Sequence, residues 1–201
     1  MRIGFDFDNT IVNYDQIFHT VASEYGVIDE HIPVSKLAVR DYLRTVNKED
    51  IWTEMQGYVY GARMSEATMY SDVFNTLQQL KNAGHTLYII SHKTRYPYQG
   101  PQYDLHAAAQ AWITQQLRYQ DLRLLAQEHI FFELTKEEKI ARIEYLACDV
   151  FIDDLPEILL AQTFPRSTQA YLFDPDQHHH ALDMPHIKVV SSWVNFASAL
   201  L

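Results

Sequence analysis

The sequence is poor in cysteine and in positive charge. Its 201 residues include a single cysteine, Cys148, so a disulfide within the chain is excluded and we expect a reducing, cytoplasmic environment. Lysine and arginine together number 16 against 26 aspartates and glutamates, which gives a formal net charge of -10. That charge argues against a nucleic acid polymer as partner and repels phosphate esters. A phosphate-binding site in this chain would therefore need locally placed cations.

Long apolar runs are also missing. No stretch is long and apolar enough to span a bilayer, so no membrane partner is expected. The chain begins MRIGFDFDNT, without a charged and then apolar leader, so we expect no signal segment. The composition, 47% hydrophobic and 21% charged, is that of a soluble globular protein. The length suits one core that carries a small insertion.

Short apolar segments alternate with helical periodicity through most of the chain. Strands are predicted at residues 2–8, 86–90, 130–132, 149–152, 169–173 and 188–190. Helices are predicted at residues 107–126, 136–146 and 157–162, after a helix that stops near residues 82–84, and a last helix begins near residue 191. This alternation predicts an α/β fold, with a three-layer, Rossmann-like parallel sheet core and crossover helices.

One long segment interrupts this alternation. From Asp15 to about residue 70 the apolar spacing is helical, with pieces at residues 34–45 and 48–60 and without a strand signal. We therefore predict a core domain of residues 1–14 and 75–201, and a small α-helical cap of residues 15–74 inserted after the first strand.

Three predicted strands end in polar residues: Asp6 and Asp8, Ser91, and Asp153 with Asp154. The carboxyl ends of parallel strands meet at one edge of an open sheet, so we expect these side chains to share a crevice. Asp6 and Asp8 are two residues apart, which puts both on the same side of an extended chain, where they could share a divalent cation. Ordinary polar strand ends, or an aspartate that caps the next helix, are the alternative.

The polar strand ends belong to four short motifs. They are Asp6-Phe7-Asp8-Asn9-Thr10-Ile11-Val12, Ser91 after an apolar strand, Lys139 near the start of a helix, and Ile152-Asp153-Asp154. In this order and spacing, the set resembles the signatures of the haloacid dehalogenase (HAD) superfamily of hydrolases. The resemblance covers residues 1–14 and about 75–201, and it points to phosphatase and 5′-nucleotidase-like members with a small helical cap of the C1 type.

The resemblance implies a role for each motif residue. Asp6 would be the nucleophile that forms an aspartyl-phosphate, and Asp8 would be the general acid and base. Ser91 would donate a hydrogen bond to a phosphoryl oxygen, and Lys139 would offset negative charge. Lys136 is an alternative to Lys139, because it lies in the same predicted helix start.

The implied cofactor is Mg²⁺. The resemblance places it on the Asp6 carboxylate, the backbone carbonyl of Asp8 and an aspartate of the pair Asp153 and Asp154, with Asp154 favoured as the direct ligand. The acid at Asp8 matters, because family members that perform carbon–halogen chemistry lack it. Phosphoryl transfer is therefore the implied reaction.

We accordingly expect a phosphoric monoester hydrolase that acts on a small phosphorylated metabolite, either a sugar phosphate or a nucleotide monophosphate. A phosphotransferase or phosphomutase is one alternative, and a non-catalytic module that binds a phosphorylated metabolite is another. The loop at residues 92–101 also combines the cations Lys93 and Arg95 with tyrosines. It could bind an anionic leaving group, or it could be packed by its own tyrosines.

Overall fold

The computed structural model describes residues 1–119, 122–179 and 186–201, and the chain divides into two compact units. The first unit comprises Met1–Val12, Met69–Lys93 and Leu117–Leu201. The second comprises Asn13–Thr68 and Thr94–Gln116. The second unit thus contains most of the predicted insertion and adds the segment at residues 94–116.

A six-stranded parallel sheet forms the centre of the first unit, with strand order β10-β9-β8-β1-β4-β7. Its strands are β1 (Arg2–Phe5), β4 (Thr86–His92), β7 (Ile130–Glu133), β8 (Val150–Asp153), β9 (Gln169–Phe173) and β10 (Ile187–Val190). Ile3 of β1 pairs with Leu87 on one side and with Val150 on the other. The strand order reverses at β1, so the carboxyl ends of β1, β4 and β8 are where a ligand site is expected.

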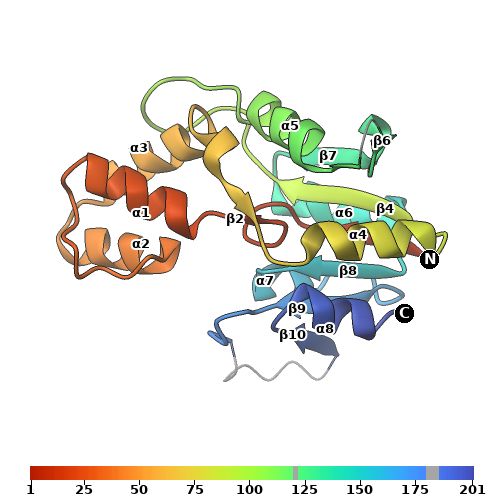
Figure 1. Cartoon of the computed structure of the whole chain (residues 1–201). Coiled ribbons are helices and arrows are strands. Elements are labelled where there is room, and N and C mark those ends of the chain that lie inside the picture. Colours follow the sequence, from red (N-terminus) through yellow and green to blue (C-terminus); the bar gives the residue numbers. More distant parts are fainter. Residues whose placement is uncertain (120–121, 180–185) are drawn as a thin grey trace. The chain divides into compact units, whose positions relative to one another are not determined.

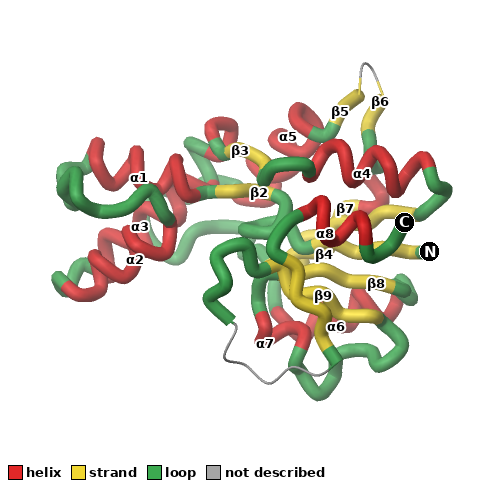
Figure 2. The backbone as a smooth tube through the Cα atoms, turned by 60° about the horizontal axis from the view of Figure 1, so that its bottom comes forward, coloured by secondary structure: helices red, strands yellow, loops and turns green. Residues whose placement is uncertain are grey.

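Helices cover both faces of this sheet (Figure 1). They are α4 (Val73–Asn82), α6 (Lys136–Tyr145), α7 (Pro156–Leu159) and α8 (Trp193–Ser198). On one face, Trp193 of α8 stacks on Phe5 of β1 with ring centroids 5.6 Å apart. On the other face, Ile143 of α6 and Leu159 of α7 share a buried core with Phe151 of β8. The strands run side by side between these layers (Figure 2), which confirms the predicted three-layer α/β core.

The second unit is helical. Its helices are α1 (Asp15–Glu24), α2 (Lys36–Thr45), α3 (Glu49–Tyr60), the 3-10 turn η1 (Met64–Glu66) and α5 (Leu105–Gln116). Aromatic residues form its interior, where the ring centroids of Phe18 and Trp52 lie 4.7 Å apart. The indole Nε1 of Trp112 donates a hydrogen bond to the carbonyl of Ala67 at 2.9 Å, which ties α5 to the segment after η1.

The end of α4 sets the start of β4 and hence the position of Ser91. The helix stops before Gly84, whose φ of 82° lies in the left-handed region that glycine adopts without a Cβ penalty. Two residues later the backbone of Thr86 donates to the carbonyl of Met1, and β4 begins beside β1. This helix end agrees with the sequence prediction.

Two segments differ from the predictions. Instead of one helix over residues 107–126, α5 ends at Gln116 and an antiparallel pair follows, β5 (Arg118–Tyr119) and β6 (Leu122–Arg123). The buried Leu117 and Leu124 are spaced as on a helix, so their periodicity could not reveal that the chain turns back. Within the predicted all-helical insertion, β3 (Thr68–Met69) pairs with β2 (Val12–Asn13), and two-residue strands are too short to show alternation.

The helices of the described residues are short. The longest, α3 and α5, have 12 residues each. In the part of the chain that the structure describes, no helix has the length and apolar character needed to cross a bilayer.

Candidate active site

The predicted site residues Asp6, Ser91 and Asp153 come together at the carboxyl ends of β1, β4 and β8. Asp6 directly follows β1, Ser91 is the second-last residue of β4, and Asp153 ends β8. The hydroxyl of Ser91 donates to Asp6 Oδ1 at 3.0 Å. All three side chains are buried. The strand order thus brings into contact residues that are far apart in the sequence.

Lys139 lies between two of these carboxylates. Its Nζ is 2.6 Å from Asp6 Oδ1 and 2.6 Å from Asp153 Oδ2, and the side chain is 1% exposed. Burial by itself would lower the pKa of Lys139, but the charges of Asp153 and Asp6 outweigh it and hold that pKa above its ordinary value. The alternative, Lys136, forms an ion pair with Glu157 and keeps 44% of its side chain exposed. The geometry therefore favours Lys139 as the cation beside Asp6.

The start of α6 explains which lysine is buried. Thr135 is the N-cap, and its side chain accepts from the backbone N–H of Glu138 at 3.1 Å. The Glu138 carboxylate accepts in return from the backbone N–H of Thr135 at 3.1 Å, which completes a capping box. This box fixes the first helical residue as Lys136 and places Lys139 on the same side as the buried Ile143.

A cluster of carboxylates could hold a metal ion. One oxygen from each of Asp6, Asp153 and Asp154 lies within 4.8 Å of the other two. Burial raises the pKa of Asp153, the neighbouring charge of Lys139 opposes that shift, and Asp6 adds to it. Lys139 contributes one positive charge against three carboxylates, so negative charge is in excess. Oxygen donors with excess negative charge suit Mg²⁺, and the residues present therefore fit the implied cofactor.

Asp153 and Asp154 have different surroundings. Both oxygens of Asp153 are engaged, Oδ2 by Lys139 and Oδ1 by a backbone N–H at 3.0 Å. Asp154 accepts longer bonds from uncharged groups, from Asn9 Nδ2 at 3.2 Å and from Thr10 Oγ1 at 3.5 Å. The carboxylate of Asp154 is also the less buried of the two. These contacts leave Asp154 better suited than Asp153 to bind a cation directly.

Asp8 has a different partner, which the sequence analysis did not identify. Its carboxylate contacts Lys93 Nζ at 2.8 Å through Oδ2 and at 3.1 Å through Oδ1. The Asp8 carboxylate is not part of the acidic cluster found among the described residues, so its role as a metal ligand through the backbone carbonyl stays a prediction. The only signal for Lys93 in the sequence was its place in the loop after Ser91. Arg95, the other cation of that loop, pairs with Asp104 inside the second unit.

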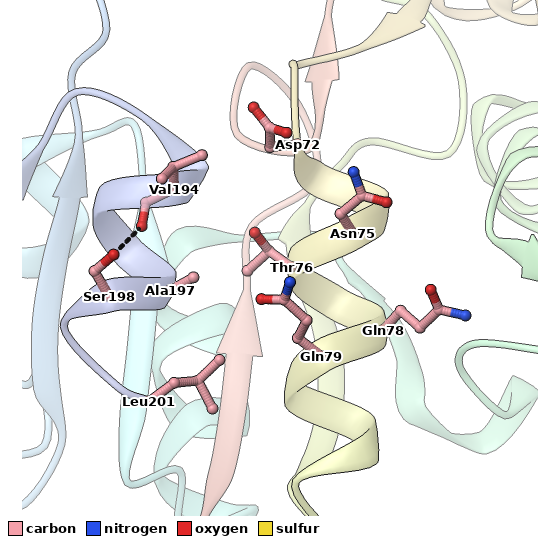
Figure 3. Close-up of a pocket in the computed structure, with 9 residues that line it drawn as sticks. All are labelled: Asp72, Asn75, Thr76, Gln78, Gln79, Val194, Ala197, Ser198 and Leu201. Atoms are coloured by element: carbon pink, nitrogen blue, oxygen red, sulfur yellow. Dashed lines mark hydrogen bonds between the residues drawn. The ribbon is translucent and has the colours of Figure 1, made fainter.

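Two cavities on the first unit lie away from these residues. A cavity of about 410 Å³ opens between α4 and α8, where Thr76, Gln79 and Ala197 are among its lining residues (Figure 3). A second, of about 840 Å³, is lined by the segment from α7 to β9 and by the start of β10. Neither contains a predicted site residue, so the chemistry is expected at the strand ends.

Comparisons with known proteins point to one family. Residues 3–100 match the family model described as haloacid dehalogenase-like hydrolase. A curated protein of Oceanobacillus iheyensis, named "Putative nucleotidase OB0422", is 23% identical over 203 residues, which cover 98% of this chain and 97% of that protein.

Solved structures share the fold. A HAD family hydrolase from Deinococcus radiodurans R1 with bound phosphate and sodium has a TM-score of 0.60 and 16% identity, over 99% of this chain and 94% of that chain. A HAD-superfamily hydrolase from Ehrlichia chaffeensis has a TM-score of 0.58 and 14% identity, over 98% of this chain and 94% of that chain.

The family match and the fold support the same assignment. The matched segment begins in β1 and includes Asp6, Asp8 and Ser91. Residues 3–100, slightly less than half of the chain, match the haloacid dehalogenase-like hydrolases, and the comparisons together support an enzyme of the hydrolase class. The resemblance seen in the sequence is thereby confirmed, whereas the type of cap stays a prediction.

Proposed function

We propose that this hydrolase is a Mg²⁺-dependent phosphatase that acts on a small phosphomonoester through an aspartyl-phosphate on Asp6. The observation that carries the proposal is the buried contact of Asp6 Oδ1 with both the Ser91 hydroxyl and the Lys139 ammonium. These two donors fix the orientation of the Asp6 carboxylate. In the proposed reaction they would also stabilise charge on the phosphoryl group that is transferred to Asp6.

In the first step, Asp6 Oδ2 attacks phosphorus and the bond from phosphorus to the ester oxygen breaks. Asp8 donates a proton to that departing oxygen, which leaves as an alcohol. In the second step, Asp8 takes a proton from water, the water oxygen attacks phosphorus, and the bond to Asp6 breaks. Inorganic phosphate is released, and Asp6 and Asp8 return to their starting states.

The proposed metal site uses Asp6, Asp154 and the backbone carbonyl of Asp8, with Asp153 holding Lys139 in place. Bound Mg²⁺ would neutralise charge on the phosphoryl group and on the acidic cluster. Phosphate and sodium are bound in the Deinococcus structure of the same fold, which supports a site for an anion together with a cation.

The substrate class is proposed as sugar phosphates or nucleotide monophosphates. Because the Oceanobacillus relative is named a putative nucleotidase, nucleotide monophosphates are the first compounds that we would test. We further propose that the helical segment of residues 15–74 acts as the cap, and that the enzyme works in the cytoplasm, in keeping with its single cysteine.

A metabolite screen tests this function. Purified protein is incubated with a panel of nucleotide monophosphates, sugar phosphates and an aryl phosphate, with Mg²⁺ or with a chelator, and released phosphate is measured. We expect release from a few related esters that stops when the metal is removed. Transfer of phosphate only when an acceptor alcohol is present would instead indicate a phosphotransferase, and binding without turnover would indicate a non-catalytic module.

Replacing the nucleophile tests the covalent step. Asp6→Asn keeps the size of the side chain but removes its nucleophilic charge, so kcat should fall by a factor on the order of 10³ or more. The exposed Asp50→Asn serves as control and should keep wild-type kcat. Wild-type protein that is quenched with acid during turnover should show, by mass spectrometry, the added mass of one phosphoryl group. Asp6→Asn treated in the same way should not. Substantial turnover by a folded Asp6→Asn protein would rule out the aspartyl-phosphate route.

A further inference from the structure

We propose that Lys93 is a positioning residue that orients the Asp8 carboxylate for its proton transfers. The inference rests on the proposed function, in which Asp8 is the general acid and base. One ammonium group contacts both oxygens of this carboxylate, at 2.8 Å and at 3.1 Å. Contacts to both oxygens restrict rotation of the carboxylate as well as its position.

The ammonium of Lys93 is itself held firmly. Lys93 follows the last residue of β4, and its backbone N–H donates to the carbonyl of Glu133 in β7 at 2.8 Å. Its side chain is 2% exposed, and Nζ lies 5.8 Å from the ring centroid of Phe7. A lysine confined at both ends loses the freedom that a surface lysine keeps, so it can set the geometry of its partner.

The contact between Lys93 and Asp8 repeats the arrangement of Ser91 and the nucleophile Asp6. Ser91 and Lys93 are two residues apart at the end of β4. Asp6 and Asp8 are likewise two residues apart after β1, so each donor lies 85 residues after its aspartate in the sequence. Ser91 donates to Asp6, and Lys93 donates to Asp8. The end of β4 thus supplies one donor to the nucleophile and one to the acid and base.

Orientation of Asp8 should matter most when the leaving group needs a proton. A misplacement of about 1 Å can cost on the order of 10²-fold in rate. An aryl phosphate expels a stable phenolate with little protonation, whereas an alkyl phosphate depends on the acid. Loss of Lys93 should therefore slow alkyl esters more than aryl esters. A lysine that contacts the substrate phosphoryl group would instead affect both alike.

The test is a double-mutant cycle of Lys93→Met, Asp8→Asn and the combined variant, with the exposed Lys188→Met as control. Mg²⁺-loaded enzymes are assayed on 4-nitrophenyl phosphate and on the best alkyl ester of the metabolite screen, and kcat and KM are measured separately. We expect Lys93→Met to lower kcat about 10- to 100-fold on the alkyl ester and less on the aryl ester, with KM little changed. When Lys93→Met is added to Asp8→Asn, kcat should not fall further.

Several outcomes would overturn the role of Lys93. These are a multiplicative loss in the combined variant, an equal loss on both esters with raised KM, and unchanged kcat in Lys93→Met. If Lys93→Met unfolds because the Asp8 charge loses this partner, the combined variant, which removes both charges, replaces it. Its kcat is then compared with that of Asp8→Asn, after thermal unfolding has shown that both variants are folded. A wild-type protein inactive on every ester would overturn the proposed phosphatase and this inference with it. If the wild type is active, the phosphatase function stands, and the variants test the role of Lys93 by itself.

Discussion

At the scale of single residues, Lys139 is the cation on which the buried acidic groups depend. Lys139→Met keeps the length of the side chain but leaves Asp6 and Asp153 without their shared partner. In metal-free protein we expect the free energy of unfolding to fall by about 3–5 kcal/mol, because buried charges lose their compensation. Urea denaturation in the presence of a chelator measures this loss. With Mg²⁺, phosphate release should also fall steeply, because Lys139 contacts the nucleophile.

Lys136→Met is the matched comparison in the same helix. Lys136 and Glu157 keep 44% and 57% of their side chains exposed, and exposed ion pairs contribute at most about 1 kcal/mol. We therefore expect a small change in stability and near wild-type kcat. Equal losses in the two variants would contradict the assignment of Lys139.

Lys139 and Lys93 differ in the signal that the sequence carries for their contacts. The family resemblance implies Lys139 with Lys136 as the alternative, and the contacts of Lys139 with Asp6 and Asp153 favour Lys139. Lys93 is different, because composition alone did not separate it from Arg95 in the same loop. Lys93 reaches Asp8 whereas Arg95 pairs with Asp104, and this difference depends on the path of the backbone after β4, which local sequence does not encode.

At the scale of elements, the capping box of α6 sets the register that buries Lys139. Thr135→Ala removes the hydroxyl that accepts from the Glu138 N–H and should lower the free energy of unfolding by about 1 kcal/mol. Ser198→Ala is the control, because that exposed hydroxyl only donates to a carbonyl within α8, and it should change stability little. Denaturant titration measures both. No loss in Thr135→Ala would show that packing of Ile143, rather than the cap, fixes the start of α6.

Elements with strong local signals were predictable, and those set by tertiary contacts were not. Residues 169–173 were predicted as a strand and form β9 with the same bounds, because an apolar run between polar turns is a strong signal. The end of α5 at Gln116 was not predicted, since the leucines beyond it fit helical spacing as well as a hairpin. A hairpin this short is decided by the surface on which it packs.

At the scale of the whole molecule, the alternation of strands and helices was enough to predict the sheet and the meeting of Asp6, Ser91 and Asp153 at its edge. The grouping of residues 94–116 with the helical unit was beyond the sequence. It depends on contacts such as that of Trp112 with Ala67, between residues 45 positions apart. Such contacts leave no periodic pattern in either segment.

The excess negative charge of the acidic cluster leads to a prediction about the stability of the whole protein. Mg²⁺ that binds only the folded state should stabilise it by about 2.7 kcal/mol at a concentration 100 times Kd, which raises Tm by several degrees. Asp154→Asn should lose most of this rise, because it removes the proposed direct ligand, and its Tm without metal should stay near the wild-type value. The exposed Asp176→Asn should keep the full rise. Thermal unfolding with MgCl₂, compared with NaCl at matched ionic strength, separates binding from general screening. A full Mg²⁺-dependent rise of Tm in Asp154→Asn would contradict the role of Asp154 as a ligand. If only Asp153→Asn lost the rise of Tm, the direct contact would be assigned to Asp153.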